Sequence, residues 1–451
     1  MAEQATASVT SADGAHWALL ANAATELRAA SIGADAESVW VAGTFDCDDV
    51  LELGGLYTRR DLKIPCRVGT YGNDLFVAEL GPAGRARLIT SFGSTGSDQL
   101  SALSLHGERL GLAMTSSDGP LDIGGGSTGL VDGDAFVAVL GSCAERTWAR
   151  GYGTASAASD SSTGVRRVVD ARFSAQGDLL TTGEFGPSID LGGGRVEGHG
   201  FGFSEVDTFV ASYASDGRLN WGRTWGNEQR QQVHAVIPDL ATASGEAVVL
   251  GISTEPVALV GQNEGLAAAH ALAVELDTAG DVVWAWSADG RPWLLAGEYA
   301  ADGSLFLAGA FDLPITLDGV VIDPGAVGDG LLLSFDAARK LTRRWVFAAA
   351  GPVSVDQVHL LANGDVALLV TFAGALTLDG TPLVADDGSG NPTSALLRLT
   401  SSGQFVAAEV FGPIESPKAE LLHGGDLLLS GKLLARARFE FGTLDPSPEG
   451  S

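Results

Sequence analysis

The stretch "DTFVASYASDGRLNWGRTWG", residues 207–226, decides the class of fold. It is 20 residues long, opens with Asp, closes with Gly and carries Trp221 at its fifteenth position. Nearly the same phrase stands at 134–153, "DAFVAVLGSCAERTWARGYG", and at 74–93, "DLFVAELGPAGRARLITSFG". Alternating apolar residues on both sides of a turn rich in Gly, Asp and Ser predict a β-hairpin.

Two hairpin phrases alternate along the whole chain, and each occurs seven times. The remaining copies of the first phrase, several of them more divergent, begin at Glu3, His270, Asp329 and Thr393. The second phrase is a strand, a Gly-containing turn and another strand, as in "VVDARFSAQGDLLTTGEF" at 168–185. A short alternating tag follows each copy, for example "IDLGG" at 189–193. Seven hairpins of each kind predict seven four-stranded units.

Seven such units predict an all-β fold, a seven-bladed β-propeller that forms a single domain over residues 1–451. The chain begins with the third and fourth strands of a unit and ends with the first and second strands. We therefore expect residues 1–22 and 417–444 to complete the seventh blade and close the ring, with 445–451 as a tail. A linear β-solenoid is the competing architecture, but it needs no complementary half-units at its ends.

The wording of the repeat resembles that of bacterial β-propeller repeat proteins of the SBBP type. The matching residues are "GDLLTTGEF" with "DTFVASYASDGRLNW", and "GDAFVAVL". The resemblance covers essentially the whole chain, although the fourth to sixth units have lost the opening "DxFVA" wording. It implies a propeller in an extracellular or cell-envelope location, and it transfers no active site. The segment after Met1, "AEQATASVTSADG", has neither a basic start nor an apolar core, so no signal peptide is predicted in this chain.

The charge of the chain excludes one class of partner. The net charge is -29, from 56 acidic and 27 basic residues, so a polyanion such as DNA or RNA is repelled. No apolar run approaches the length of a membrane span. The sequence therefore predicts no nucleic-acid partner and no membrane span, and the plain interpretation of the acidity is solubility. Oligomeric state does not follow from it.

The three cysteines and the acidic loops bear on disulfides and metals. Cys47 and Cys66 lie in one long loop, and a disulfide between them is predicted if the protein is exported, with two ordinary thiols as the alternative. Cys143 stands apart, and no Cys/His spacing predicts a zinc site. Acidic loops at 46–49 and 386–392 have weak calcium character, so calcium is the one cofactor considered.

Two excursions that interrupt the repeat form the predicted binding surface. Residues 54–73 place aromatic and basic groups in an otherwise acidic chain, and residues 194–206 add further aromatic groups. Both stand between the second and third strands of their units, so we expect them on the same face, where they suit a protein or a glycan. Solvated loops are the alternative. The candidate residues are Tyr57, Arg59, Arg60, Lys63, His199, Phe201 and Phe203.

Residues facing the predicted central channel form the second candidate site. Arg172, Glu298 and His359 each stand five residues before a turn Gly on the innermost strand, and Glu420 stands near the equivalent place. These residues form either a small-ligand site or a set of satisfied polar groups beside channel water, and the second interpretation is favoured.

A Trp recurs at one repeat position, where packing between blades is favoured over a ladder of stacked sugars. These residues are Trp17, Trp148, Trp221, Trp284 and Trp345.

The aspartates at the start of one strand have a plain structural explanation. The third strand opens with Asp74, Asp134 or Asp207, and capping of a turn is favoured there over a ring of calcium ligands.

The favoured function is a non-catalytic binding or scaffold propeller that recognises a protein or glycan at one face. A lyase or hydrolase at the channel mouth would show a cluster of titratable groups with shifted pKa values. A structural component of a larger assembly would instead show a broad apolar patch.

Overall fold

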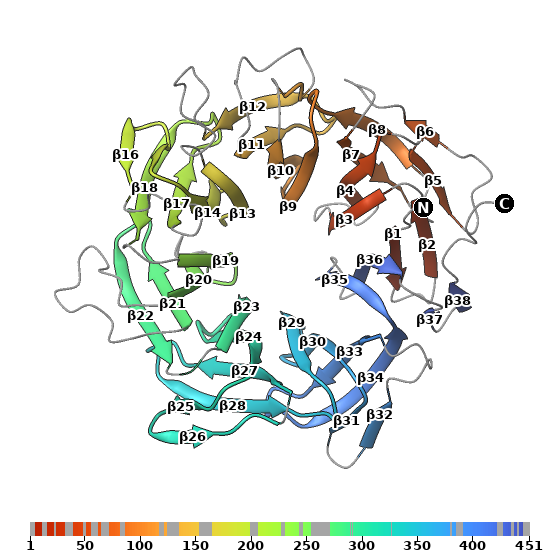
Figure 1. The fold of residues 1–451 in the computed structure, drawn as a ribbon, viewed down its shortest axis with the longest axis vertical. Coiled ribbons are helices and arrows are strands. Elements are labelled where there is room, and N and C mark those ends of the chain that lie inside the picture. Colours follow the sequence, from red (N-terminus) through yellow and green to blue (C-terminus); the bar gives the residue numbers. More distant parts are fainter. Residues whose placement is uncertain are drawn as a thin grey trace. The chain divides into compact units, whose positions relative to one another are not determined.

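The computed structural model shows an all-β protein, and the residues it describes contain strands and no helix (Figure 1). The described residues are 5–10, 16–21, 24–31, 39–47, 51–55, 62–64, 72–81, 86–116, 121–123, 135–152, 165–198, 206–226, 231–242, 247–253, 271–288, 290, 292–325, 327–378, 381–384, 391–421, 427–433, 437–439 and 442–444. Within these ranges, no helix has the length and apolar character needed to cross a membrane.

The chain divides into two compact units. Unit 1 comprises Met1–Gln232, Ala419–Lys432 and Glu449–Ser451, and unit 2 comprises Val233–Lys418 and Leu433–Pro448. Both units are built from antiparallel four-stranded sheets, as the sequence predicted.

The sheets of unit 1 have the orders β3-β4-β7-β8, β12-β11-β10-β9 and β13-β14-β17-β18, with a small sheet β15-β16 and a larger sheet β35-β36-β1-β2-β5-β6. The strands are β1 (Ala5–Thr10), β2 (His16–Ala21), β3 (Ala24–Ser31), β4 (Val39–Asp46), β5 (Leu51–Gly55), β6 (Leu62–Ile64), β7 (Asn73–Leu80), β8 (Ala86–Phe92), β9 (Asp98–His106), β10 (Arg109–Ser116), β11 (Ala135–Leu140), β12 (Arg146–Gly151), β13 (Val165–Phe173), β14 (Leu179–Phe185), β15 (Ser188–Asp190), β16 (Arg195–Glu197), β17 (Asp207–Tyr213), β18 (Leu219–Trp225) and β36 (Leu427–Leu433).

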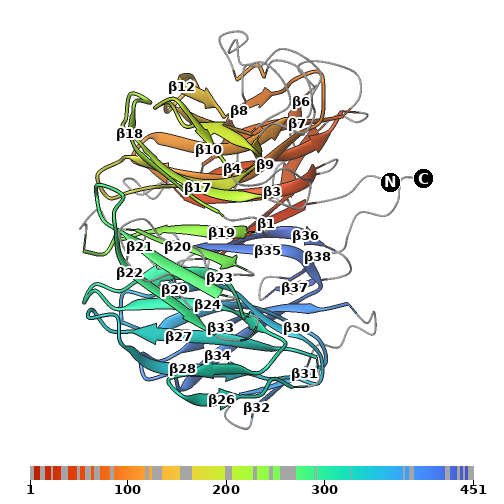
Figure 2. The same cartoon turned by 60° about the vertical axis from the view of Figure 1, so that its left-hand side comes forward.

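The sheets of unit 2 have the orders β19-β20-β21-β22, β23-β24-β27-β28 and β29-β30-β33-β34, with two-stranded sheets β25-β26, β31-β32 and β37-β38 (Figure 2). The strands are β19 (Gln231–Pro238), β20 (Ala247–Ser253), β21 (Ala271–Leu276), β22 (Val282–Ala288), β23 (Pro292–Tyr299), β24 (Leu305–Phe311), β25 (Ile315–Leu317), β26 (Val320–Ile322), β27 (Asp329–Phe335), β28 (Leu341–Phe347), β29 (Val353–Leu360), β30 (Val366–Phe372), β31 (Ala375–Leu378), β32 (Thr381–Val384), β33 (Thr393–Leu399), β34 (Phe405–Gly412), β37 (Ala437–Phe439) and β38 (Gly442–Leu444). The remaining strand, β35 (Ile414–Leu421), contains the chain boundary between the units, at Lys418 and Ala419, and belongs to the sheet with β36.

A strand near the start of the chain pairs with one near its end. β1 runs antiparallel to β36, with Ala5 opposite Lys432 and Thr10 opposite Leu427. The other side of β1 pairs with β2, so β36-β1-β2 places strands from both ends of the chain in one sheet of unit 1. This pairing satisfies the backbone of β1 on both edges.

The turn inside the 207–226 phrase shows how the hairpins close. The Gly217 N–H donates to the Ala214 carbonyl, and the Ala214 N–H donates to the Arg218 carbonyl, both at 2.9 Å. Gly217 has φ of 81°, a left-handed conformation that a glycine adopts without steric cost. This is a three-residue hairpin loop ending in a left-handed residue, and the ladder shifts register beside it at Ser212 and Tyr213.

The packing of the first residue of the same phrase accounts for the glycine at its end. Asp207 opens β17 and is buried, and a Cβ atom at Gly226, just beyond β18, would overlap the Asp207 carboxylate. Asp74 and Gly93 repeat this arrangement in the sheet β3-β4-β7-β8. The phrase therefore opens with Asp and closes with Gly because the missing side chain makes room for the buried carboxylate.

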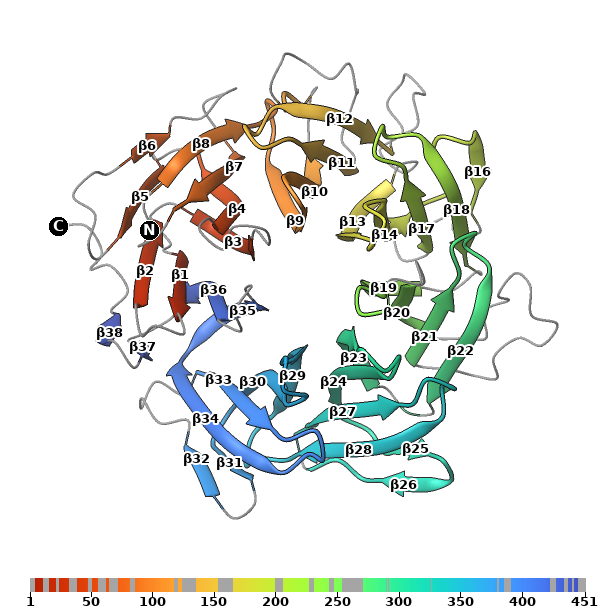
Figure 3. The same ribbon diagram turned by 180° about the vertical axis from the view of Figure 1, so that it is seen from behind.

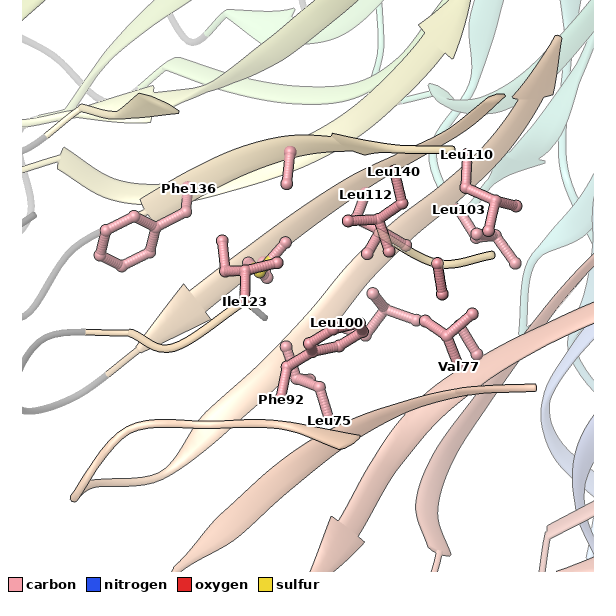
Figure 4. Close-up of a cluster of buried hydrophobic side chains, with 14 of the residues drawn as sticks. Leu75, Val77, Phe92, Leu100, Leu103, Leu110, Leu112, Ile123, Phe136 and Leu140 are labelled. Carbon is pink, nitrogen blue, oxygen red and sulfur yellow. The ribbon is translucent and has the colours of Figure 1, made fainter. Parts of the chain in front are cut away.

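Neighbouring sheets pack through their apolar faces, with the tags wedged between them. In unit 1, Leu75 and Val77 of β7 and Phe92 of β8 belong to the same buried cluster as Leu110 and Leu112 of β10 (Figure 4). Ile123, from the tag after β10, lies in this cluster. Leu191 and Leu317 are buried at the matching place in other tags, and Leu378 is partly buried there.

Three of the tags in the described part of the chain also pair with the last strand of the preceding sheet. β5 pairs along β2, with Leu19 opposite Gly55. Asp122 bridges to Gly93 after β8, and Leu376 bridges to Ala349 after β28. The sequence predicted these tags as short alternating segments, and backbone pairing through them connects adjacent sheets.

Candidate functional site

The recurring tryptophan packs on the next sheet of the same unit. In unit 1, the Trp148 ring of β12 lies 5.8 Å from the Tyr213 ring of β17, between ring centroids. A Cβ atom at Gly217 would lie 2.8 Å from the Trp148 ring, so the indole covers the turn glycine. Arg150 donates to the Gly217 carbonyl at 3.2 Å and places its guanidinium over the Tyr213 ring.

Unit 2 repeats this packing with different partners. Trp284 of β22 contacts Phe335 of β27 edge to face, with ring centroids 5.4 Å apart. A Cβ atom at Gly403, in the turn before β34, would overlap the Trp345 indole of β28. Packing between sheets is therefore confirmed for Trp148, Trp284 and Trp345. It stays a prediction for Trp221, and the side chain of Trp17 lies outside the described residues.

Two of the predicted channel residues meet in unit 2. Glu298 stands on β23 and His359 on β29, the first strands of adjacent sheets. The His359 Nδ1 lies 3.3 Å from Glu298 Oε2, with the His359 side chain 14% exposed and that of Glu298 33% exposed. The pair bridges the two strands, and the carboxylate keeps an edge in solvent. The exposed edge of the Glu298 carboxylate can accept a hydrogen bond from a ligand.

Asp356, also on β29, is a polar residue that the sequence analysis missed. The β29-β30 ladder shifts register at this point, so Asp356 is an extra residue in a β-bulge between Val355 and Gln357. Its carboxylate accepts hydrogen bonds from Ser354 Oγ at 2.7 Å and Thr371 Oγ1 at 2.6 Å. Burial raises the pKa of Asp356, and the two hydroxyl groups and Lys418 oppose that rise.

Arg172 has a different partner in unit 1. It lies on β13, and its Nε is 3.2 Å from Oδ1 of Asp170, two residues earlier on the same strand. Asp170 is buried and also accepts the Ala171 N–H at 2.9 Å. The Arg172 guanidinium therefore pairs with a buried carboxylate of its own strand, a satisfied arrangement of the kind favoured from the sequence.

The largest pKa shifts belong to buried groups. Asp98 begins β9, is fully buried and accepts two hydrogen bonds from Ser94. Desolvation raises the pKa of Asp98 to about 6, and the nearby Asp74 carboxylate adds to the rise. Desolvation likewise raises the pKa of Tyr152, to about 12, and of Tyr213. These shifts follow from burial within unit 1.

A buried ion pair in unit 2 was also missed. Arg339 takes the turn position that Gly217 holds in unit 1, with φ of 62°. Its guanidinium binds the Glu275 carboxylate through two nitrogens, with Nε to Oε2 at 2.7 Å, and donates to the Gly303 carbonyl at 2.8 Å. Tyr299 donates its hydroxyl to Glu275 at 2.8 Å, and burial, with the negative carboxylate adding to it, raises the pKa of Tyr299 far above its usual value. The signal was available in "DAARK" at 336–340, where Arg replaces the expected Gly.

The predicted rim surface falls largely outside the described residues. Tyr57, Arg59, Arg60, His199, Phe201 and Phe203 all lie outside them. Lys63 belongs to β6, where its backbone is opposite Glu52 of β5, but its side chain is not described. The rim surface stays a prediction.

The cysteine prediction is only partly covered. Cys47 is disulfide-bonded and Cys143 is an exposed free thiol. Cys66 lies outside the described residues, so its pairing with Cys47 stays a prediction. Among the residues the structure describes, no group of three or more His, Cys, Asp or Glu side chains is arranged to hold a metal ion.

Comparison with known proteins identifies no family. No family model and no curated protein matches the sequence. Solved structures with some similarity include Sqt1 from Chaetomium thermophilum, at 9% identity over 76% of this chain and 98% of that chain, with a TM-score of 0.34. The Neurospora crassa Pan2 WD40 domain matches at 13% identity over 74% of this chain and 88% of that chain, with a TM-score of 0.26. The Pseudomonas brassicacearum lignostilbene dioxygenase matches at 11% identity over 86% and 92%, with a TM-score of 0.38. Similarities this low assign no function to the chain.

Proposed function

We propose that this chain is a single seven-bladed β-propeller that acts as a non-catalytic binding or scaffold protein and recognises a protein or glycan at one face. Two kinds of observation support this: the pairing of β1 with β36, which places strands from near both ends of the chain in one sheet, and the location of the groups with the largest pKa shifts.

The observation that carries the non-catalytic part is where those groups lie. A catalytic acid or base with a shifted pKa stands where substrate can reach it. Asp98, Tyr152 and Tyr213 are fully buried in the packing of unit 1, and Tyr299 is buried against Glu275 in unit 2. Their shifts arise from desolvation, which any buried titratable side chain experiences. These groups therefore belong to the packing within and between sheets and not to a solvent-facing site.

Ring closure is tested by removing residues 1–22. This deletion removes β1 and β2 and leaves an edge of β36 unpaired, so we expect insoluble or aggregated protein. Removal of 445–451 is the matched control and should leave the protein soluble. A 1–22 deletion variant that stays monomeric with an unchanged thermal midpoint would contradict the ring.

The proposed export to the envelope or extracellular space is tested by counting thiols. Under denaturing conditions, one free thiol per chain is expected if Cys47 and Cys66 are bonded and Cys143 is free. Three free thiols in protein isolated without reductant would reject the bridge.

Recognition is tested on the rim residues. The purified chain is screened against a glycan array and against bacterial envelope extracts, beside a variant with Arg59, Arg60, Phe201 and Phe203 all changed to Ala. Loss of a captured partner in the variant supports the rim. If a partner binds the variant equally well, the rim is wrong and the Glu298–His359 pair becomes the next site to change.

A further inference from the structure

The hairpin β25-β26 stands in the same between-strand segment of its sheet as the two predicted excursions. Asp318 and Gly319 form its two-residue turn, with φ of 48° and 74°. Two left-handed residues in the order Asp-Gly are the signature of a type I′ turn, which fixes the register of a hairpin. Ile315 pairs with Ile322 and Leu317 with Val320, so the hairpin is regular up to its turn.

One strand of this hairpin presents apolar side chains to solvent. Ile315 and Leu317 of β25 are buried, and Ile322 of β26 packs against the same core cluster. Val320 is 44% exposed and Val321 61% exposed, although both are β-branched residues suited to strand pairing. Leu313 and Val327, at the two ends of the segment that forms the hairpin, are 44% and 49% exposed.

The outer edge of β26 is open among the described residues. β25 and β26 form a two-stranded sheet, so β25 occupies one edge of β26 and no described strand occupies the other. Figures 1 and 3 both place β26 at the outer margin of unit 2. An open edge of uncharged β-branched residues is a template for pairing with another strand.

Two other accessory hairpins, β15-β16 and β31-β32, carry the usual protection against such pairing. β16 is occupied by the exposed ion pair of Arg195 and Glu197, with Nε to Oε1 at 2.7 Å. β32 contains Pro382, which cannot donate to a ladder. β26 has the sequence Val-Val-Ile, with neither a charge nor a proline. An edge left unprotected where the edges of β16 and β32 are protected indicates a docking edge.

The charge around β26 selects the partner. Asp312, Asp318 and Asp323 are exposed around the hairpin, and no Lys or Arg occurs between Arg291 and Arg339. A second copy would pair β26 antiparallel to itself and bring these aspartates together in two chains of net charge -29 each. Like charges gathered at a short seam oppose association. An extended segment flanked by basic residues meets attraction instead.

We propose that β26 is a docking edge for a partner protein, which adds an extended segment of alternating β-branched residues flanked by Lys or Arg. Backbone hydrogen bonds to β26 would provide affinity, Val321 would contact the alternate side chains, and the aspartates would attract the flanking basic groups. This deepens the proposed binding function, on which it rests, by naming a partner chemistry and a second surface besides the rim.

The test uses the full chain and labelled ten-residue peptides with alternating Val and Thr at the centre. One peptide has Lys at both ends, one has Glu, and one has Lys ends and an N-methylated central Val, which removes a backbone donor but keeps the side chain. Fluorescence anisotropy measures binding to the natural chain, Val321→Lys, Val321→Ile and Val406→Lys. Val406, on β34, is 45% exposed and is the matched control for placing a charge on an exposed valine of unit 2.

We expect the Lys-flanked peptide to bind the natural chain at least tenfold more tightly than the other two peptides. Val321→Lys should weaken its binding at least tenfold, and Val321→Ile and Val406→Lys should change it less than twofold. Equal binding of the Lys-flanked and N-methylated peptides would overturn the docking edge, as would equal effects of Val321→Lys and Val406→Lys. A dimer of the natural chain in sedimentation velocity that Val321→Lys abolishes would overturn the partner in favour of a second copy. None of these outcomes depends on the rim, so each can occur while the proposed binding function stands.

Discussion

The joint between β12 and β17 in unit 1 and the joint between β22 and β27 in unit 2 occupy the same place in the repeat but are built differently. In unit 1, Gly217 leaves room in the turn, and Trp148 fills that room from the preceding sheet. In unit 2, Arg339 occupies the same turn position and reaches back to Glu275 on the preceding sheet. Trp284 meanwhile packs on Phe335.

The difference shows that the repeat specifies a contact across the joint and not a particular residue. An aromatic ring over a glycine is an apolar contact that needs no exact partner charge. A buried arginine needs its carboxylate, because a charge left alone in the interior is costly. We therefore expect the unit 2 joint to be more sensitive to loss of a single partner.

The largest effect is expected from breaking that ion pair on one side. Arg339→Ala leaves Glu275 buried without its guanidinium, and we expect a loss of about 3–5 kcal/mol in the free energy of unfolding, measured by urea denaturation. The double variant Arg339→Gly with Glu275→Leu removes both charges and should recover most of that loss. A double variant no more stable than Arg339→Ala would show that the ion pair is not what the joint needs.

The stability of unit 1 is expected to depend on pH through one buried carboxyl group, Asp98. Burial raises the pKa of Asp98 from 3.8 to about 6, so between those values the folded chain binds the proton more tightly than the unfolded chain. Its contribution to stability is present below about pH 4 and is lost as the pH rises through 6, a change on the order of 3 kcal/mol. Asp98→Asn should remove this dependence in equilibrium unfolding measured from pH 4 to pH 7.

A second variant tests the direction in which the pH of this transition moves. The Ser116 hydroxyl favours the charged form of Asp98, so Ser116→Ala should move the transition to higher pH. Unchanged pH dependence in Asp98→Asn would assign the titration to another group.

The unit 1 joint itself is broken by giving its turn a side chain. Gly217→Ala places a Cβ against the Trp148 ring at a left-handed residue, and we expect a loss of about 2–3 kcal/mol in thermal or urea unfolding. Gly107 is the control because it has φ of 60° and nothing within 4 Å of an added Cβ. Gly107→Ala should cost only the backbone strain, about 1 kcal/mol. Equal losses of unfolding free energy in the two variants would mean that the Trp148 indole moves aside at no cost.

The smallest effects compare one hydroxyl in each unit. Tyr299→Phe removes a donor to the charged Glu275 and should cost about 2 kcal/mol. Tyr213→Phe removes a donor to the neutral Leu191 carbonyl, at 3.0 Å, and should cost about 1 kcal/mol. Urea denaturation of both variants on the same day resolves the difference, and a reversed order would contradict the greater dependence of unit 2 on charge.

The sequence by itself determined the strands, the turns and the grouping into four-stranded sheets. These follow from local features: a period of two in the apolar residues, and Gly or Asp-Gly where a left-handed residue is needed, as at Gly217. The role of Trp148 could also be predicted, because a large aromatic at one repeat position recurs wherever two sheets meet.

Only the tertiary structure decided the contacts between residues far apart in the chain. Arg339 and Glu275 are 64 positions apart, and neither sequence context reveals that the two side chains meet. The burial of Asp356 depends on a register shift within β29, and the exposure of Val321 depends on which face of the β25-β26 hairpin packs against the core. Desolvation and edge pairing are set by whatever packs around a residue, and a local pattern of apolar and polar residues does not contain that information.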